Sequence, residues 1–291
     1  TKVEIFLKSE KIIKMFQNLK KRNIPLILLN EKISKKSFKR WNRFKKFSEF
    51  VFNLIDYAYP QNSETGGFLK KFKLKKIRYI GNLKFIEDKK NKQDVINKKL
   101  YLELKKRKIF IAASTHSDEE KFASKAHLLL KKSNKKLLTI IIPRHIERTK
   151  KISIEVEKLG LNVIYHSSGN KKLDNADIYI VDTFGESKKF YKIASTVFLG
   201  GSIVKRGGQN PLEPARYGAK ILHGPHIENF SEIYSYLNSL KISKKIETPN
   251  QLASSIKYKK NVGKTSEIKN LGDKIFKNTV KELDKIISNE T

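Results

Sequence analysis

The chain has 291 residues, of which 38% are hydrophobic and 10% aromatic; this suffices for one large or two ordinary globular domains and excludes wholesale disorder. It has no cysteine, which excludes disulfides, thiolate metal sites and a cysteine nucleophile. Its 63 lysines and arginines against 29 acidic residues give a formal net charge of +34, which favours polyanionic partners such as nucleic acid or an anionic membrane face.

Three interpretations of this charge stay open. Nearly all the basic residues are lysines spread along the whole chain, which favours compositional drift with solvated helix faces. A membrane-surface role comes next. Nucleic-acid binding is the least favoured, because the chain has no ribonucleoprotein aromatic motif, zinc finger or glycine-clamp loop.

The first part of the chain predicts few strand–helix units. One long helix is predicted to follow Ser34, because apolar residues recur at helical spacing on one stripe: Trp41, Phe44, Phe47, Val51, Leu54 and Ile55. The polar segment 86–99 is predicted to link two domains. Before that linker we expect about three units, too few for a complete doubly wound domain, so the chain is expected to begin within one. The other predicted elements are strands at 3–7, 24–29 and 77–81 and a helix at 9–22.

After the linker, apolar strand patterns alternate regularly with amphipathic helix patterns. Such alternation is typical of right-handed βαβ units and a parallel sheet. The predicted strands cover 108–114, 137–143, 162–166, 177–182, 196–201 and 220–224, and the predicted helices cover 117–132, 145–158, 186–194, 211–217, a stretch from about 228, and the last 25 or so residues.

In open α/β sheets, ligands bind where strands end and helices begin, so these loops are the candidate sites. After the strand at 108–114, Ser114, Thr115 and His116 precede the acidic residues 118–120. This loop is either a well-capped helix start or a polar loop that approaches a ligand, and both interpretations stay open.

Two further loops carry candidate ligand-binding groups. Pro143 and Arg144 enter a predicted helix, where an arginine opposes the helix dipole unless an anion is shared; the alternative is a surface ion pair with Glu147. In the segment 182–187, Asp182 could accept hydrogen bonds from ribose hydroxyls, or Glu186 could merely cap a helix.

The most informative segment is 199–230, LGGSIVKRGGQNPLEPARYGAKILHGPHIENF. Four glycines bracket a basic turn, and Asn210 and Pro211 then start a predicted helix with Glu213 one turn inside it. A glycine-rich loop that leads into a helix N-terminus predicts an anion cradle. The spacing matches neither a P-loop nor the dinucleotide-binding GxGxxG pattern. His223 and His226 lie in a Gly-Pro loop without a third ligand, so no metal site is predicted.

At these loops the chain resembles the Kdo transferases, bacterial enzymes that attach 3-deoxy-D-manno-octulosonate (Kdo) from CMP-Kdo to lipid A in lipopolysaccharide synthesis. The similar segments are STH with the acids that follow, PRHIER (143–148), DTFGE (182–186), GGS (200–202), GGQNPLEPA (207–215) and HGPHIENF (223–230). Residues 24–41 and 77–85 resemble the family's first domain, so the similarity extends through almost the whole chain.

The resemblance implies an α/β fold of GT-B type, with two Rossmann-like domains whose parallel sheets face a cleft. Residues 1–88 would form the later part of the acceptor-side domain, which is expected to be incomplete, and 89–291 would form the nucleotide-sugar-binding domain. It implies a CMP-Kdo donor, a lipid A precursor as acceptor, no cofactor or metal, no nucleic acid, and a peripheral location at the anionic cytoplasmic face of the inner membrane.

Family roles carry over onto the matching positions. Lys84 would stabilise negative charge in the transition state, while Glu10 is a weaker catalytic candidate and the family's general base is expected outside this chain. In the implied reaction a lipid hydroxyl attacks the anomeric carbon and CMP leaves. The residues expected at the CMP site are Pro143, Arg144, Phe184, Gly185, Glu186, Asn210, Pro211, Leu212 and Glu213.

Two departures from the family pattern lead to alternative functions. The family has an N-terminal membrane anchor and more residues than this chain, and Lys8 stands where a glutamate assists catalysis. The chain is therefore expected to bind CMP-Kdo and to transfer little or no sugar. A catalytically weak CMP-sugar-binding relative is the main alternative to an active transferase, and a basic nucleic-acid-binding protein is the less favoured one.

Overall fold

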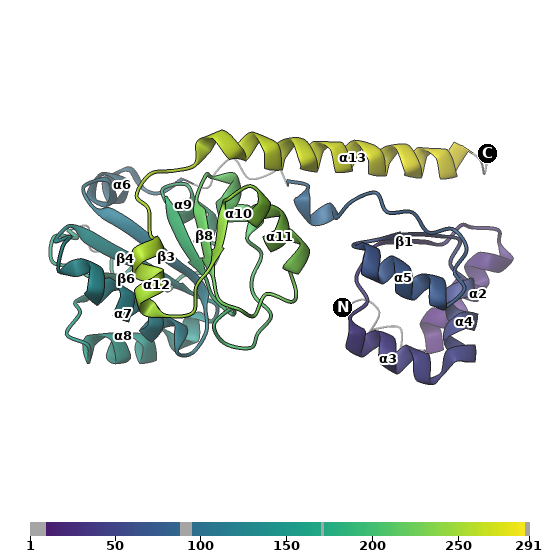
Figure 1. Cartoon of the computed structure of the whole chain (residues 1–291), viewed down its shortest axis with the longest axis horizontal. Coiled ribbons are helices and arrows are strands. Elements are labelled where there is room, and N and C mark those ends of the chain that lie inside the picture. The colour runs from purple at the N-terminus through teal and green to yellow at the C-terminus, as the bar shows by residue number, and fades with distance from the viewer. Residues whose placement is uncertain (1–9, 88–94, 170–171, 289–291) are drawn as a thin grey trace. The chain divides into compact units, whose positions relative to one another are not determined.

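The computed structural model describes residues 10–87, 95–169 and 172–288 (Figure 1). The predicted strand at 3–7 and Lys8 lie outside the described residues. The chain divides into two compact units, which are residues 1–87 together with 269–291, and residues 88–268. The final helix was predicted to belong with the second domain; in the structure, its residues from 269 onward group with the first unit.

The first unit has a small parallel sheet covered by helices. Strands β1 and β2 pair in parallel, with Ile27 opposite Tyr57. The segment 77–81, predicted to be a strand, forms only one bridge, between Ile77 and Ala58. The elements are α2 (Glu10–Lys21), β1 (Ile27–Glu31), α3 (Lys35–Arg43), α4 (Lys45–Asn53), β2 (Tyr57–Pro60), α5 (Ser63–Lys71), the 3₁₀ helix η1 (Leu83–Phe85) and most of α13 (Thr265–Ser288).

An aromatic cluster forms the core of this unit. The Phe52 ring stacks on Phe72 at 4.9 Å and meets Trp41 edge-on at 5.1 Å. The single long helix predicted after Ser34 is wrong, because the chain breaks at Phe44 into α3 and α4. This break leaves the Phe44 side chain 69% exposed, while Trp41 stays buried.

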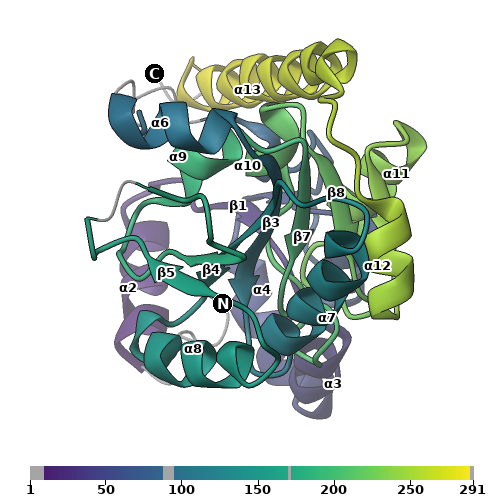
Figure 2. The same cartoon turned by 90° about the vertical axis from the view of Figure 1, so that its left-hand side faces the viewer.

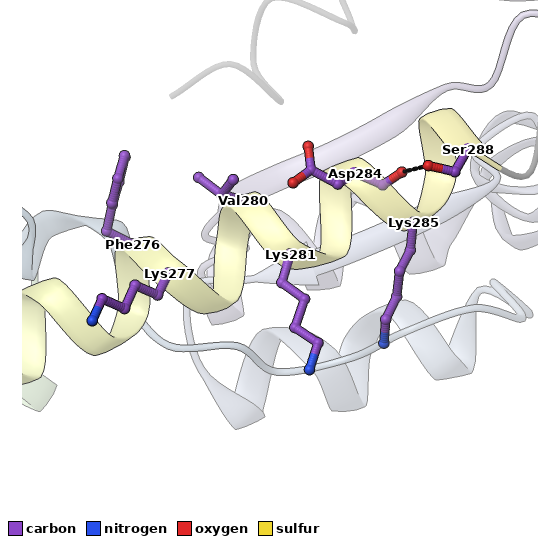
Figure 3. Close-up of a pocket in the computed structure, with 7 residues that line it drawn as sticks. All are labelled: Phe276, Lys277, Val280, Lys281, Asp284, Lys285 and Ser288. Atoms are coloured by element: carbon purple, nitrogen blue, oxygen red, sulfur yellow. Dashed lines mark hydrogen bonds between the residues drawn. The ribbon is translucent and has the colours of Figure 1, made fainter.

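Helix α13 contributes to the same unit. Arg78 forms an ion pair with Glu282 at 2.6 Å, and Ile275 is buried beside Gly81, where a β-carbon would lie 2.6 Å from the isoleucine side chain. Figure 3 shows another side of the helix, where Phe276 and Val280 lie on one row and three lysines on the next. The C-terminal stretch is helical as predicted.

The second unit is built on a seven-stranded sheet. Its strand order is β5-β6-β4-β3-β7-β8-β9, and every neighbouring pair is parallel. The predicted strand series and the α/β class are confirmed; α6, β9 and α12 were not predicted. The elements are α6 (Lys98–Lys105), β3 (Lys108–Thr115), α7 (Glu119–Lys131), β4 (Leu137–Pro143), η2 (Ile146–Arg148), α8 (Thr149–Glu157), β5 (Val163–Tyr165), β6 (Ile178–Ile180), α9 (Ser187–Tyr191), β7 (Thr196–Leu199), α10 (Leu212–Arg216), β8 (Lys220–His223), α11 (Ser231–Ser239), β9 (Ser243–Lys245), α12 (Pro249–Ser255) and η3 (Val262–Lys264).

Helices cover both faces of this sheet. Figure 2 shows α7, α8 and α12 on one face and α9, α10 and α11 on the other. The side chains of Phe110, Ile141, Ile178, Phe198 and Leu222 are fully buried in the core between these layers. Because the strands are parallel, their carboxyl ends lie along one edge of the sheet, and the loops that follow them are held there.

Candidate functional site

The carboxyl edge of the large sheet brings the predicted loops together. In the strand register, Ala113 of β3 lies opposite Leu199 of β7, and Thr115 pairs with Pro143 of β4. On the outer side, Ile141 lies opposite Ile180 of β6. The loops that begin at residues 116, 144, 181 and 200 therefore start side by side, although up to 84 positions (116 to 200) separate them in the sequence.

A buried carboxylate lies at the centre of these loops. Glu119, the first residue of α7, is fully buried. Its two oxygens accept hydrogen bonds from the backbone N–H groups of His116 and of residues 201–204, at N···O distances between 2.6 and 3.4 Å. Five N–H donors satisfy the charge, and Glu119 has no cation partner in the described part of the chain. The Glu119 carboxylate thus binds the backbone N–H groups at the start of the glycine-rich loop.

This finding changes the predicted role of that loop. We expected the glycine-rich segment to cradle a ligand anion, but its first four N–H groups after Gly200 point to Glu119. The glycine at 200 is needed for this packing, since a β-carbon there would lie 2.5 Å from the Ser114 carbonyl oxygen and 2.7 Å from a Glu119 oxygen. From the sequence, Glu119 was predicted only as one of the acids at a helix start. Its proximity to the glycine-rich segment arises from the pairing of β3 with β7, which leaves no local signal in the sequence.

A second buried acid fixes the next loop. Glu120 is 1% exposed, and its carboxylate forms a bidentate pair with Arg148 at 2.9 and 3.1 Å. Arg148 ends the 3₁₀ turn that follows Arg144, so this pair ties the loop after β4 to the start of α7. Bidentate arginine–carboxylate pairs fix the relative orientation of the two side chains strongly. The Arg148–Glu120 pair therefore restrains the loop that carries Arg144.

Arg144 is an exposed cation at this edge. Its backbone N–H donates to the Thr115 carbonyl oxygen at 3.0 Å, while Pro143 before it is buried. The guanidinium has no hydrogen-bond or ion-pair partner within the described part of the chain, so the alternative pairing with Glu147 does not form there. The side chain is available to an anion.

Two imidazoles lie close to the same loops. The rings of His116 and His145 are 5.9 Å apart, and His116 also lies against Gly201. Burial lowers the pKa of His116 below its ordinary value, although the neighbouring Glu119 charge opposes this effect. The His116 Nε2 atom is buried and finds no hydrogen-bond partner among the described residues.

The loop after β6 is tied to the loop after β5. Asp182 accepts hydrogen bonds from the backbone N–H (2.9 Å) and the hydroxyl of Ser167, so it braces the neighbouring loop after β5. Phe184 is 72% exposed at the tip of a turn in which Gly185 has a φ of +80°. Glu186 pairs with Lys189 at 2.9 Å.

The segment 210–213 lies beside α9. The Asn210 side chain accepts a hydrogen bond from the Leu212 backbone N–H at 3.1 Å, as predicted for a helix start, and Pro211 and Leu212 are buried. Helix α10 contacts α9, and Glu213 lies 3.9 Å from Lys188. The two predicted CMP-binding segments, 184–186 and 210–213, are therefore neighbours in the fold.

The two catalytic candidates belong to the first unit. Lys84 lies in η1, where its backbone N–H donates to the Asn82 side chain at 3.0 Å. Glu10 is the first residue of α2, and its side chain lies outside the described part of the structure. Among the described residues, no three His, Asp or Glu side chains converge as metal ligands would, and no helix has the length and hydrophobicity needed to cross a bilayer.

Comparison with known proteins identifies the family. The family model for 3-deoxy-D-manno-octulosonic-acid transferase (kdotransferase) matches residues 1–87. The 3-deoxy-D-manno-octulosonic acid transferase of Haemophilus influenzae is 30% identical over 81% of this chain and 56% of the relative, and that of Rickettsia bellii is 30% identical over 87% and 60%. The chain belongs to the Kdo transferase family. It spans somewhat more than half the length of these relatives.

Solved structures agree on the fold of this Kdo-transferase-family chain. The C-terminal CMP-Kdo binding domain of WaaA from Acinetobacter baumannii has a TM-score of 0.51 at 24% identity, covering 62% of this chain and 96% of that domain. A glycosyltransferase from Rickettsia africae has a TM-score of 0.55 at 14% identity and covers 97% of this chain and 83% of its own. The predicted α/β fold of GT-B type is confirmed.

Proposed function

We propose that the chain binds CMP-Kdo and serves in a glycosyltransferase that moves Kdo to a lipid A precursor and releases CMP. The observation that carries this proposal is the match to Kdo transferases, which extends over 81–91% of the chain and includes both units. The same proposal places the protein at the cytoplasmic face of the inner membrane, where the acceptor lipid is found.

The geometry supports the donor site at the carboxyl edge of the large sheet. We assign the phosphate of CMP to Arg144, which is exposed and has no anionic partner among the described residues. The exposed ring of Phe184 offers a stacking surface for a base, and Glu213 on the neighbouring α10 can accept hydrogen bonds from sugar hydroxyls. Lys84 is assigned to the charge that develops in the transition state.

The hydrogen bonds to Glu119 limit which groups can stabilise the phosphate of CMP. In the reaction the lipid hydroxyl attacks the anomeric carbon and gives its proton to a general base, the bond to the CMP phosphate breaks, and negative charge develops on that phosphate. Backbone N–H groups of residues 201–204 already donate to Glu119, so they are not free to stabilise it. Side-chain cations, Arg144 first among them, must then supply most of the stabilisation.

Calorimetric titration with CMP, with UMP and ADP as nucleotide controls, tests the donor site. We expect selective CMP binding that weakens roughly 10- to 100-fold in Arg144→Ala, because a charge-assisted contact to phosphate is lost. Lys150→Ala, an exposed lysine near the start of α8, is the matched control and should bind like the wild type. Equal affinities in both variants, or no preference for CMP, would remove Arg144 or the cytidine specificity from the proposal.

Transfer is tested separately with CMP-Kdo and a lipid A precursor. Product formation would identify an active transferase, whereas CMP binding without product would favour the binding-only alternative. Glu10→Gln and Lys84→Ala variants then report on the two catalytic candidates. A loss of product without a loss of CMP affinity is the result expected for a group that acts on the transition state.

A further inference from the structure

A concave surface lies at the edge of the large sheet opposite the proposed donor site. It is a groove of about 780 Å³ between α6, the first residues of β3, the end of α9 and residues 258–260. Lys108 and Ile109 at the amino end of β3 line it. Strands in this sheet are parallel, so the groove lies at the end away from the loops of the proposed donor site.

The charged side chains that line the groove are basic. Among the described residues that line it, seven are lysine or arginine and none is aspartate or glutamate. Arg107 is committed to the protein itself, since its guanidinium donates to the carbonyl oxygens of Leu137 and Ala176 at 2.8 and 2.7 Å, among others. Lys189 has a carboxylate partner in Glu186.

Several of the other lysines have no carboxylate partner. Lys98 and Lys105 lie on α6 and are exposed, without an ion pair to any residue that the structure describes. Lys108 donates only to the neutral amide of Asn134, at 2.7 Å, and lies 5.3 Å from the centre of the Tyr258 ring. Like charges gathered around one concavity repel each other, and an anion bound there would relieve that repulsion.

The floor of the groove is apolar. Leu104 and Ile96 are buried beneath it, while Val95 is 70% exposed and Tyr101 41% exposed at its edge. An aliphatic floor below a rim of lysines suits a molecule that has a phosphate at one end and hydrocarbon at the other. Inorganic phosphate would leave the apolar floor unused.

We propose that this groove binds an anionic phospholipid of a bilayer, with the lipid phosphate at Lys98, Lys105 and Lys108 and the upper acyl chain against Val95 and Tyr101. The proposal rests on the membrane location given above and does not depend on CMP binding. It adds a lipid contact of the second unit, at the edge of the sheet away from the donor site.

Vesicle co-sedimentation tests the site with phosphatidylcholine vesicles that contain or lack phosphatidylglycerol. We expect binding only to the anionic vesicles, and a roughly 10-fold or greater loss in the double variant Lys98→Glu/Lys105→Glu. The matched control is Lys121→Glu/Lys150→Glu, which makes the same change of net charge at exposed positions on α7 and α8. The control should lose far less affinity than the groove variant.

A third variant tests the hydrocarbon contact. Val95→Ser leaves the charge unchanged and should weaken binding to anionic vesicles several-fold, because the aliphatic contact with the acyl chain is lost. Equal losses in the two double variants would mean that overall charge alone is responsible, and would overturn the site. So would unchanged vesicle binding in the groove variant, or a single-stranded oligonucleotide that binds through these lysines while vesicles do not.

CMP affinity, measured in the same variants, keeps the two proposals apart. Residues of the groove are not part of the proposed donor site, so Lys98→Glu/Lys105→Glu should bind CMP as the wild type does. Retained CMP binding with unaltered vesicle binding would overturn only the lipid groove.

Discussion

At the start of α7 a single carboxylate determines the conformation of the loop after β7. Glu119 is buried, and backbone N–H groups from two loops converge on it. In an unfolded chain water would solvate both the carboxylate and these N–H groups, so the folded loop is stable only because the partners satisfy each other. The residue is therefore a positioning residue for the glycine-rich segment.

Glu119→Gln should destabilise the second unit. The substitution removes the charge and directs an NH₂ donor at N–H groups that need an acceptor, so at least one buried donor loses its partner. We expect a loss of roughly 2–4 kcal/mol in the free energy of unfolding, measured by urea denaturation followed by far-UV circular dichroism. The adjacent Asp118→Asn is the control, since Asp118 is exposed, makes no capping hydrogen bond and has a φ of +75° that asparagine tolerates. Equal effects of the two substitutions would contradict the role of Glu119.

At the scale of elements, His127 joins α7 to the sheet. The side chain is fully buried, its Nδ1 atom lies 2.9 Å from the Thr139 hydroxyl of β4, and its Nε2 atom lies 3.5 Å from Asp177. Burial lowers the pKa of His127 to about 4; Asp177 opposes this shift, and the charges of Lys131 and Arg107 add to it. The helix therefore packs on the sheet with a neutral imidazole.

This packing predicts a dependence of stability on pH. The unfolded chain has the ordinary histidine pKa of about 6.5, so between pH 6.5 and 4 it binds a proton that the folded chain rejects, and stability falls as the pH falls. From pH 7 to pH 5 the contribution of His127 is on the order of 2 kcal/mol. His127→Asn should lower the free energy of unfolding at both pH 7 and pH 5. Its free energy of unfolding should fall less between pH 7 and pH 5 than that of the wild type. The measurement is urea denaturation at both pH values. An equal fall in the free energy of unfolding of the two proteins would show that His127 does not contribute to the pH dependence.

Most strands of the second unit were predictable because they are buried runs rich in branched apolar residues. The segment 137–143 is a strand over its whole predicted length, since each of its residues is buried in the centre of a parallel sheet. The first unit gave weaker signals. Its strand β2 holds only four residues, Tyr57–Pro60, and the apolar stripe from Trp41 to Ile55 hides the break at Phe44. Periodicity alone does not report where a helix is interrupted.

The site was predictable only at the level of loops. Apolar runs in the sequence locate the strands, and the carboxyl ends of parallel strands lie along one edge of the sheet. Arg144, Phe184 and Glu213 each follow a strand, so their place at this edge could be predicted. The partners of Asp182 and Glu119 are backbone groups of other loops, and hydrogen bonds of that kind depend on tertiary placement. No sequence pattern distinguishes an acid that binds a ligand from one that binds its own chain.

At the scale of the whole molecule, the end of the chain belongs to the first unit. The face of α13 toward that unit buries Ile275 and Ile286, while Phe276 and Val280 are 53% and 39% exposed beside a row of lysines (Figure 3). The first unit therefore consists of two segments that the whole second unit separates in sequence. Its stability should depend on residues near the C-terminus.

The single tryptophan makes this testable. Trp41 is buried in the core of the first unit, so the fluorescence of the wild-type chain reports the unfolding of that unit. Ile275→Ala removes a buried side chain and should lower the stability seen by Trp41 fluorescence by about 2–4 kcal/mol. Val280→Ala, one turn further along α13 on its exposed row, should change it by less than about 1 kcal/mol. If the Trp41 transition were the same in both variants, α13 would not stabilise the first unit, and the division of the chain would follow the order of the sequence instead.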